Sequence, residues 1–229
     1  MWNRKELKMR GKAVFMKNYG SSVLAALFMG ILVNFAGSVN VGTLENIMTA
    51  EISDAALELM SMILVVAGII GALITFFVAN ILEVGGCRFF VQNQTGQPGV
   101  GTILDIFRSG NYLNVVKTML CRDIFIFLWS LLFLVPGIIK AYEYRMIPYI
   151  LAENPGMDRK EAFKISKEMM TGQKLDFFVL ELSFYGWILL SFFTCNLLNV
   201  FFIAPYMQAS FAEVYYYNKV KAYQEGYIR

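Results

Sequence analysis

The chain has 229 residues, of which 57% are apolar and 16% are charged, and its mean hydropathy is +0.54. Soluble domains carry about 25% charged residues, so this composition excludes an ordinary soluble domain and indicates a membrane protein. The chain has no histidine, and Cys87, Cys121 and Cys195 are isolated. We therefore expect no metal site, no disulfide framework and no cofactor, and a catalytic site is disfavoured.

Lysine and arginine residues are distributed unevenly around the first two apolar runs. Six cations precede Ser21 to Gly37, whereas residues 39–58 hold four acidic residues and no cation before the second run, Leu59 to Leu82. Because cations near spanning helices stay inside, residues 1–18 are predicted to be cytoplasmic and residues 39–58 external. A cleavable signal peptide is a less favoured alternative, since the segment before the first run is long and amphipathic.

The middle of the chain predicts two short helices. The apolar run Ile124 to Ile139 is followed by Ile138 to Ala152, and we expect the helices to be broken at Pro136-Gly137. The chain then returns to the cytoplasmic side. That position suits the basic segment 153–174, which carries five cations.

Two further runs, 177–194 and 197–215, complete a set of about six transmembrane helices, and the basic tail 218–229 is predicted to be cytoplasmic. The sequence thus predicts an all-α, single-domain protein over residues 1–229, with both termini inside. The expected location is the cytoplasmic membrane, crossed several times.

Amphipathic segments precede some of these spans and are predicted to lie at the cytoplasmic interface. One begins at Asp158, which with Glu161 has the spacing of a capping box. Similar segments near Glu6 and Asp105 suggest a threefold pattern of one interfacial helix followed by two spans. The alternative is that any cytoplasmic connector of a membrane protein is amphipathic.

Small and polar residues recur every four positions in the first two spans. This spacing predicts that the two helices pack closely on each other, and a dimer interface is the less favoured alternative. The positions are Ser22, Ala26, Gly30 and Asn34 in the first span, and Ala67, Gly71, Thr75 and Ala79 in the second.

Charged residues within the last spans are the candidates for a site. Lys140, Glu143, Arg145 and Glu181 are expected at membrane depth, and an ion pair between Arg145 and Glu181 is predicted to join the fourth and fifth spans. One interpretation is that these charges only hold irregular helices together. The other is a polar pocket for a lipid head group or a small solute.

Two functions follow from these patterns. The first is a non-enzymatic membrane module that binds anionic lipids or a protein partner, another copy included, through Lys160, Lys164, Lys167 and the N-terminal cations. The second is a transporter or permease component that uses the polar pocket. An enzyme is a weak third option, since no nucleophile, base and orienting group are placed together, and no nucleic-acid partner is expected.

Several short motifs occur along the second half of the chain: Val135-Pro136-Gly137-Ile138-Ile139-Lys140, Tyr144-Arg145-Met146, Glu153-Asn154-Pro155, Gly172-Gln173-Lys174, Ser183-Phe184-Tyr185-Gly186-Trp187 and Pro205-Tyr206. In these motifs the chain resembles a bacterial membrane-protein family, catalogued as domain of unknown function 975. The resemblance spans essentially the whole chain and is most specific from Leu128 to Tyr206. It implies an integral membrane protein of bacteria and carries no established activity. A more distant likeness, to the membrane domains of some glycerophosphodiester phosphodiesterases, rests on the Pro-Gly motif and the amphipathic helix after it.

Overall fold

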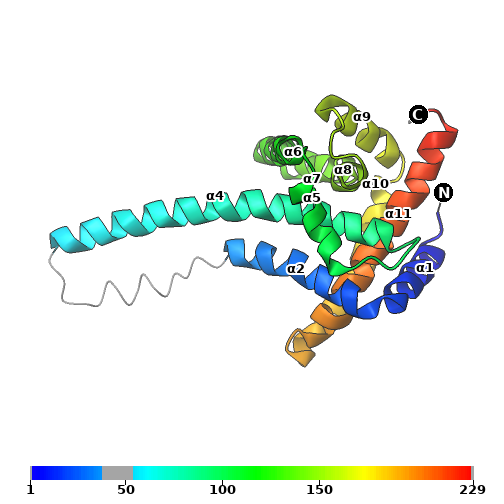
Figure 1. The fold of residues 1–229 in the computed structure, drawn as a ribbon, viewed down its shortest axis with the longest axis horizontal. Coiled ribbons are helices and arrows are strands. Elements are labelled where there is room, and N and C mark those ends of the chain that lie inside the picture. Colours follow the sequence, from blue (N-terminus) through cyan, green and yellow to red (C-terminus); the bar gives the residue numbers. More distant parts are fainter. Residues whose placement is uncertain (1, 38–53, 228–229) are drawn as a thin grey trace.

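The computed structural model describes residues 2–37 and 54–227, and within these ranges the chain is helical and contains no strand (Figure 1). The prediction of an all-α protein is therefore confirmed. The helices are α1 (Arg4–Lys17), α2 (Tyr19–Gly37), α4 (Asp54–Gln92), α5 (Asp105–Arg108), α6 (Tyr112–Leu132), α7 (Leu134–Glu143), α8 (Ile147–Glu153), α9 (Arg159–Met170), α10 (Lys174–Ser191) and α11 (Ala204–Gln224). The 3₁₀ helices η1 (Val100–Leu104) and η2 (Phe192–Thr194) and the π-helical turn η3 (Asn199–Ile203) complete the set.

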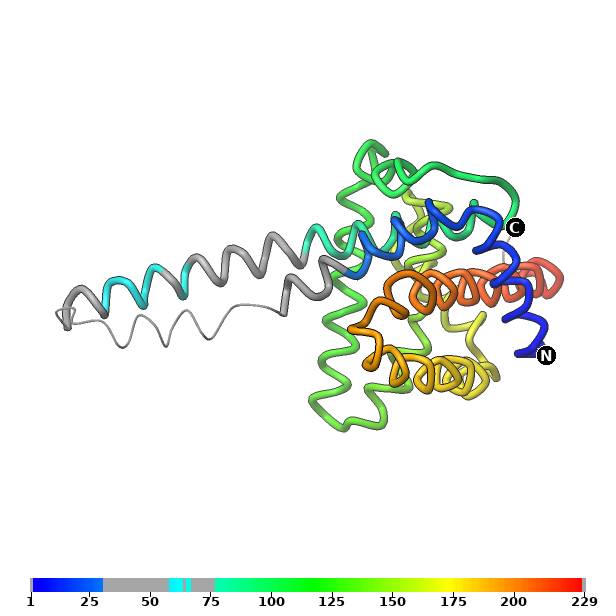
Figure 2. The backbone as a smooth tube through the Cα atoms, turned by 90° about the horizontal axis from the view of Figure 1, so that it is seen from below, coloured from blue at the N-terminus to red at the C-terminus, as the bar shows by residue number. Residues whose placement is uncertain are grey.

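Three helical hairpins extend from one shared base. They are α2–α4, α6–α7 and α10–α11, and they point in different directions from the base (Figures 1 and 2). Each hairpin follows a short helical segment: α1, then η1 with α5, then α9. The element order thus repeats three times, as the sequence pattern suggests, while superposition of the three units stays a prediction.

Large apolar side chains from all three hairpins meet in the base. Burying aromatic and branched side chains together is the main favourable term that holds such a junction closed. Fully or almost fully buried members of this core come from seven helices: Phe15, Phe89, Ile106, Met119, Ile147, Phe177 and Phe211.

Helix α1 closes the base by packing against α11 and α10. A side chain at Gly11 has no room, because a Cβ atom there would lie 2.8 Å from Ser210 Oγ and 2.9 Å from Ser210 Cα. The indole Nε1 of Trp2 donates a buried hydrogen bond of 2.8 Å to Gln173 Oε1. The N-terminal amphipathic segment is therefore an integral part of the fold.

The helix break in the α6–α7 hairpin does not lie at Pro136-Gly137, so the predicted position is wrong. The break lies at Phe133, whose backbone is extended (φ −155°, ψ 139°), and Pro136 and Gly137 lie in the first turn of α7. Proline is tolerated in a first turn because the N–H it lacks there would have no intrahelical acceptor. A second interruption at residues 144–146 separates α7 from α8.

The predicted packing of the first two apolar helices on each other is confirmed, because α2 and α4 lie side by side (Figure 1). Ser22 and Ala26 of the predicted small-residue stripe are buried. The side chains of Asn34, Ala67, Gly71 and Thr75 lie outside the described residues.

The structure describes the three predicted segments outside the spans, 39–58, 153–174 and 218–229, to different extents. Of the external acidic segment, residues 39–53 lie outside the described residues, and residues 54–58 begin α4. The basic segment contains α9, with Asp158 as its N-cap; the Asp158 side chain accepts a 2.9 Å hydrogen bond from the Lys160 N–H. The tail is helical as far as Gln224, the last residue of α11.

Length and composition pick out one helical stretch of the described residues, Lys174–Thr194, as able to cross a membrane. Tyr19–Gly30 is a shorter apolar helix. One such stretch is weak support for a membrane protein, and the six crossings stay a prediction.

Candidate functional site

The predicted ion pair between Arg145 and Glu181 is present. Arg145 Nη2 donates to Glu181 Oε1 at 3.2 Å, and the Tyr142 hydroxyl donates to Glu181 Oε2 at 2.6 Å. The Arg145 guanidinium also lies over the rings of Phe177 and Phe211, at 5.7 and 5.3 Å from their centroids. This contact joins the turn after α7 to α10, as expected for the junction of the fourth and fifth predicted spans.

Lys140 and Glu143 form a separate group with Lys174, which the sequence argument did not assign to the site. Glu143 accepts from Lys140 Nζ at 3.0 Å and from Lys174 Nζ at 2.8 Å. The Glu143 side chain is only 5% exposed, whereas the two lysines are 23% and 31% exposed. This group ties the end of α7 to the start of α10.

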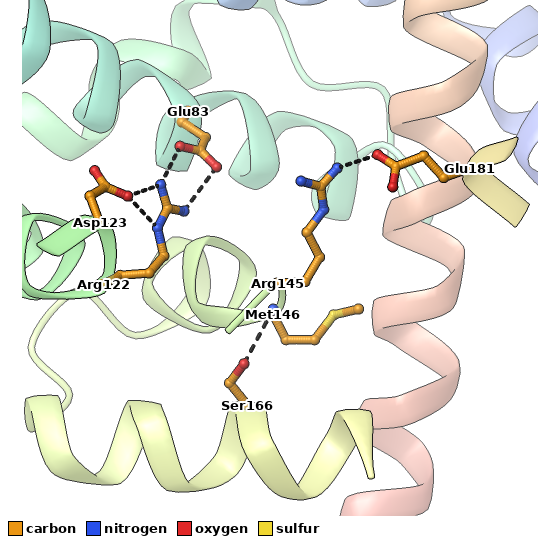
Figure 3. A network of polar contacts seen from close by, with 7 residues as sticks. All are labelled: Glu83, Arg122, Asp123, Arg145, Met146, Ser166 and Glu181. Atoms are coloured by element: carbon orange, nitrogen blue, oxygen red, sulfur yellow. Dashed lines mark hydrogen bonds and ion pairs between the residues drawn. The ribbon is translucent and has the colours of Figure 1, made fainter. Parts of the chain in front are cut away.

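The backbone at this junction is fixed by Ser166 of α9. Its hydroxyl donates to the Glu143 carbonyl oxygen at 2.8 Å and accepts from the Met146 N–H at 3.3 Å (Figure 3). The serine therefore satisfies two backbone groups at the interruption between α7 and α8, where helical hydrogen bonds are lost. The contact also holds α9 against the irregular segment that carries Arg145.

A cavity of about 540 Å³ lies beside Arg145, between α2, α4, α8, α10, η3 and α11. Among the described residues, Arg145 lines this cavity, whereas Lys140, Glu143 and Glu181 do not. The four predicted charges are therefore not gathered around this cavity, and a pocket that all four share stays a prediction. The polar side chains of the lining are Asn80, Glu83, Arg145, Tyr149, Asn199 and Gln208.

Glu83 is the second charged residue of the cavity and was missed by the sequence argument. Both of its carboxylate oxygens accept from Arg122, at 3.0 Å each, and Arg122 also contacts Asp123 at 2.8 Å (Figure 3). This network joins α4 to α6. A signal was available, since Glu83 directly follows the second apolar run and Asp123 directly precedes the run from Ile124.

Lys160, Lys164 and Lys167 all lie on the exposed side of α9. The opposite side of the helix is buried through Ala162 and Ile165, so the predicted amphipathic arrangement is present. Within the described residues, no ion pair involves any of the three lysines. They form a basic surface that is available to a ligand.

The N-terminal cations differ in their surroundings. Lys5 and Lys12 are exposed on α1, next to the exposed Met9. Lys8 instead donates to Ser183 Oγ at 2.8 Å and lies 4.0 Å from the centre of the Phe184 ring. Burial lowers the pKa of the Lys8 amino group, and the neighbouring Arg4 charge adds to the effect. Lys8 thus anchors α1, while Lys5 and Lys12 are further exposed cations, on a different helix from the basic surface of α9.

The described residues contain no group of three or more histidine, cysteine or acidic side chains placed to hold a metal ion. The cavity presents one cation, one carboxylate and neutral polar groups. Such a lining is suited to binding a polar or charged group by ion pairs and hydrogen bonds.

In comparison with known proteins, the second half of the chain matches a family model. A family model described as "Protein of unknown function (DUF975)" matches residues 133–224, the region from Phe133 at the α6–α7 turn to the end of α11. No curated protein and no solved structure matches the chain. The likeness to glycerophosphodiester phosphodiesterases has no support among these findings. The predicted family resemblance is supported over residues 133–224, which include Arg145, Glu181 and the basic helix α9: this part of the chain is similar to the DUF975 family of proteins of unknown function. The resemblance of residues 1–132 stays a prediction.

Proposed function

We propose that this protein is a non-enzymatic integral membrane protein of the bacterial cytoplasmic membrane that binds anionic lipids through the basic surface of α9 and α1. In this proposal the three hairpins enter the bilayer. The base lies at the cytoplasmic interface with both termini inside.

Exposed apolar side chains near the hairpin ends support membrane insertion. Leu131, Leu132 and Leu134 at the α6–α7 turn are 66–73% exposed, and Phe192 and Phe193 between α10 and α11 are 83% and 88% exposed. Water-soluble proteins rarely expose contiguous apolar patches of this kind. Lipid would cover these side chains, and the helices satisfy their own backbone hydrogen bonds, as a bilayer requires.

The same placement supports about six membrane crossings. The helices α2, α4, α6, α10 and α11 each coincide with a predicted span or contain most of it, and α7 with α8 covers the remaining one. The helices diverge from the base, so we propose tilted crossings or partial insertion for individual hairpins (Figure 2).

The observation that carries the lipid-binding proposal is that Lys160, Lys164 and Lys167 are exposed and form no ion pair with any other part of the chain that the structure describes. Each cation near an anionic bilayer surface contributes about 1 kcal/mol of binding free energy, so the three lysines together contribute about 3 kcal/mol. Lys5 and Lys12 of α1 add to this attraction. A protein partner with an acidic surface is the alternative occupant of the same lysines.

The test is retention of anionic lipid by protein released from nanodiscs that contain phosphatidylglycerol and phosphatidylcholine in equal amounts. Native mass spectrometry counts the lipids that stay bound. The variant Lys160→Gln, Lys164→Gln, Lys167→Gln is expected to lose most of its excess phosphatidylglycerol. The matched control, with arginine at the same three positions, is expected to keep it. Equal retention by the glutamine variant and the wild type would reject lipid binding by α9 and turn attention to a protein partner.

The cavity beside Arg145 favours a second candidate, a transporter or permease component. Its prediction is that Glu181→Gln, which removes the ion pair of Arg145, abolishes the flux of a solute while the protein stays folded. Lys140→Met lies outside the cavity lining and becomes the control that retains flux. Absence of flux in the wild type across a panel of solutes would reject this candidate.

A further inference from the structure

We propose that the cavity between the first and third hairpins binds the zwitterionic head group of an amphiphile, with Arg145 holding its anionic oxygens and Glu83 its ammonium group. The inference rests on the proposed membrane location but not on the basic surface of α9. It assigns a ligand class to a cavity that shares only Arg145 with the polar pocket expected from the sequence.

The two charges of the cavity limit the ligand. Arg145 and Glu83 have opposite charges and both line the cavity. Arg145 lies between Glu83 and Glu181 (Figure 3). A purely anionic group would be repelled by Glu83, and a purely cationic group by Arg145, whereas a zwitterion satisfies both.

Both charged side chains retain capacity for a ligand despite their existing ion pairs. The bond to Glu181 uses Nη2 of Arg145, and a guanidinium has five N–H donors in total. The Arg145 side chain is 40% exposed and that of Glu83 is 36% exposed. The Glu83 oxygens that accept from Arg122 have further lone pairs, which an ammonium group can use.

The remaining lining indicates an amphiphile and not a wholly polar solute. Toward the hairpin ends the lining carries no charged side chain: it includes the apolar Ala26, Met29, Ala79 and Ile188 together with the neutral amides of Asn80 and Asn199. From Ala79 to Cys87 the cavity follows α4 for roughly 12 Å, at about 1.5 Å per residue. A head group at the charged end therefore places the start of an apolar chain along the apolar walls, pointing toward the hairpin ends.

The test uses nanodiscs that contain equal amounts of phosphatidylethanolamine, phosphatidylcholine and phosphatidylglycerol with identical acyl chains. Native mass spectrometry then measures which lipid stays on the protein. The measurement is made on the Lys160→Gln, Lys164→Gln, Lys167→Gln variant, so that phosphatidylglycerol held by α9 is not counted. This variant is expected to retain one phosphatidylethanolamine at least about tenfold more often than phosphatidylglycerol, which is the discrimination that one charge-assisted hydrogen bond provides. Equal retention of all three lipids would overturn the proposal.

Two variants assign the charges. Glu83→Gln is expected to reduce the preference for phosphatidylethanolamine over phosphatidylglycerol about tenfold, and Arg122 keeps Asp123 as its partner in this variant. The double variant Arg145→Gln, Glu181→Gln removes an ion pair without leaving a lone charge and is expected to lose retention of the phospholipid. Unchanged preference in Glu83→Gln, or unchanged retention in the double variant, would contradict the assignment.

A third variant tests the cavity without altering any charged side chain, so that loss of an ion pair cannot account for its effect. Ala204→Phe narrows the cavity without changing its charge, and it is expected to lower retention about tenfold while the far-ultraviolet circular dichroism stays at the wild-type value. Full retention in a folded Ala204→Phe protein would place the lipid elsewhere.

Two controls separate this inference from its alternatives. The Lys160, Lys164, Lys167 to glutamine variant is expected to keep phosphatidylethanolamine even where it loses phosphatidylglycerol, so failure of either proposal is seen on its own. Soluble glycerophosphoethanolamine tests the apolar part of the ligand. Inability of this compound to displace the lipid supports an amphiphile, whereas displacement at equal concentration would overturn the role given to the apolar walls.

Discussion

Replacing both lysines that contact Glu143 is expected to destabilise the protein more than removing the carboxylate itself. The Glu143 side chain is 5% exposed and is held by Lys140 at 3.0 Å and Lys174 at 2.8 Å. The double variant Lys140→Gln, Lys174→Gln leaves this carboxylate buried without a cation. Breaking a buried pair in this way costs about 3–5 kcal/mol.

The single variants are expected to behave differently, because either lysine alone still pairs with Glu143. Each replacement costs about 1 kcal/mol, so the double variant exceeds the sum of the singles by about 2 kcal/mol. Glu143→Gln leaves two lysines that are 23% and 31% exposed and whose flexible side chains reach water. Its expected cost is therefore only about 1–2 kcal/mol.

Thermal unfolding in a mild detergent, followed by circular dichroism, measures this cycle. With about 2–4 °C of Tm per kcal/mol, the double variant is expected to lose roughly 10 °C and each single roughly 3 °C. Lys117→Gln, at an exposed position on α6, is the control for loss of a lysine charge. A double variant that loses no more than the two singles together would refute the reasoning and show that water reaches Glu143.

Three further substitutions test the packing of the base, each by its effect on Tm under the same conditions. Gly11→Val is expected to separate α1 from α11 and cost at least about 2 kcal/mol, because even a Cβ atom meets Ser210 at 2.8 Å; a stable variant would contradict this contact. Phe89→Ala removes a side chain that is 0% exposed and is expected to cost about 3–5 kcal/mol, whereas a loss under 1 kcal/mol would show that the site is loosely packed. Asp158→Ala removes the N-cap of α9 and is expected to cost about 1 kcal/mol and to speed hydrogen exchange at the Lys160 amide, with Asp158→Asn as the control that keeps the cap.

The local features of the fold were predictable from the sequence because they depend on residues close together in the chain. The apolar runs predicted the positions of the long helices, and the Asp158 cap predicted the start of α9. The exposed side of α9 followed from helical periodicity alone. The break at Phe133 was missed by three residues, because proline and glycine in a first turn give the same sequence signal as a helix break.

The candidate site was predictable only in part. Equal expected depth was sufficient to pair Arg145 with Glu181, and this pair is present. The expected depth in the membrane did not show that Lys174 pairs with Glu143. It also did not show that Lys140 and Glu143 lie outside the lining of the cavity. These outcomes depend on the turn at residues 144–146, which directs neighbouring side chains to different surroundings.

By itself, the sequence determined an all-helical chain, the order of short and long helices, and a basic face on α9. Helix formation, capping and periodicity are set within a few residues, so composition and spacing report them directly. Only the tertiary structure decided that Glu83 meets Arg122, 39 residues further along the chain, and that Arg145 and Glu83 face one cavity. Such contacts depend on how the hairpins pack at the base, where the shapes of many buried side chains together select one arrangement.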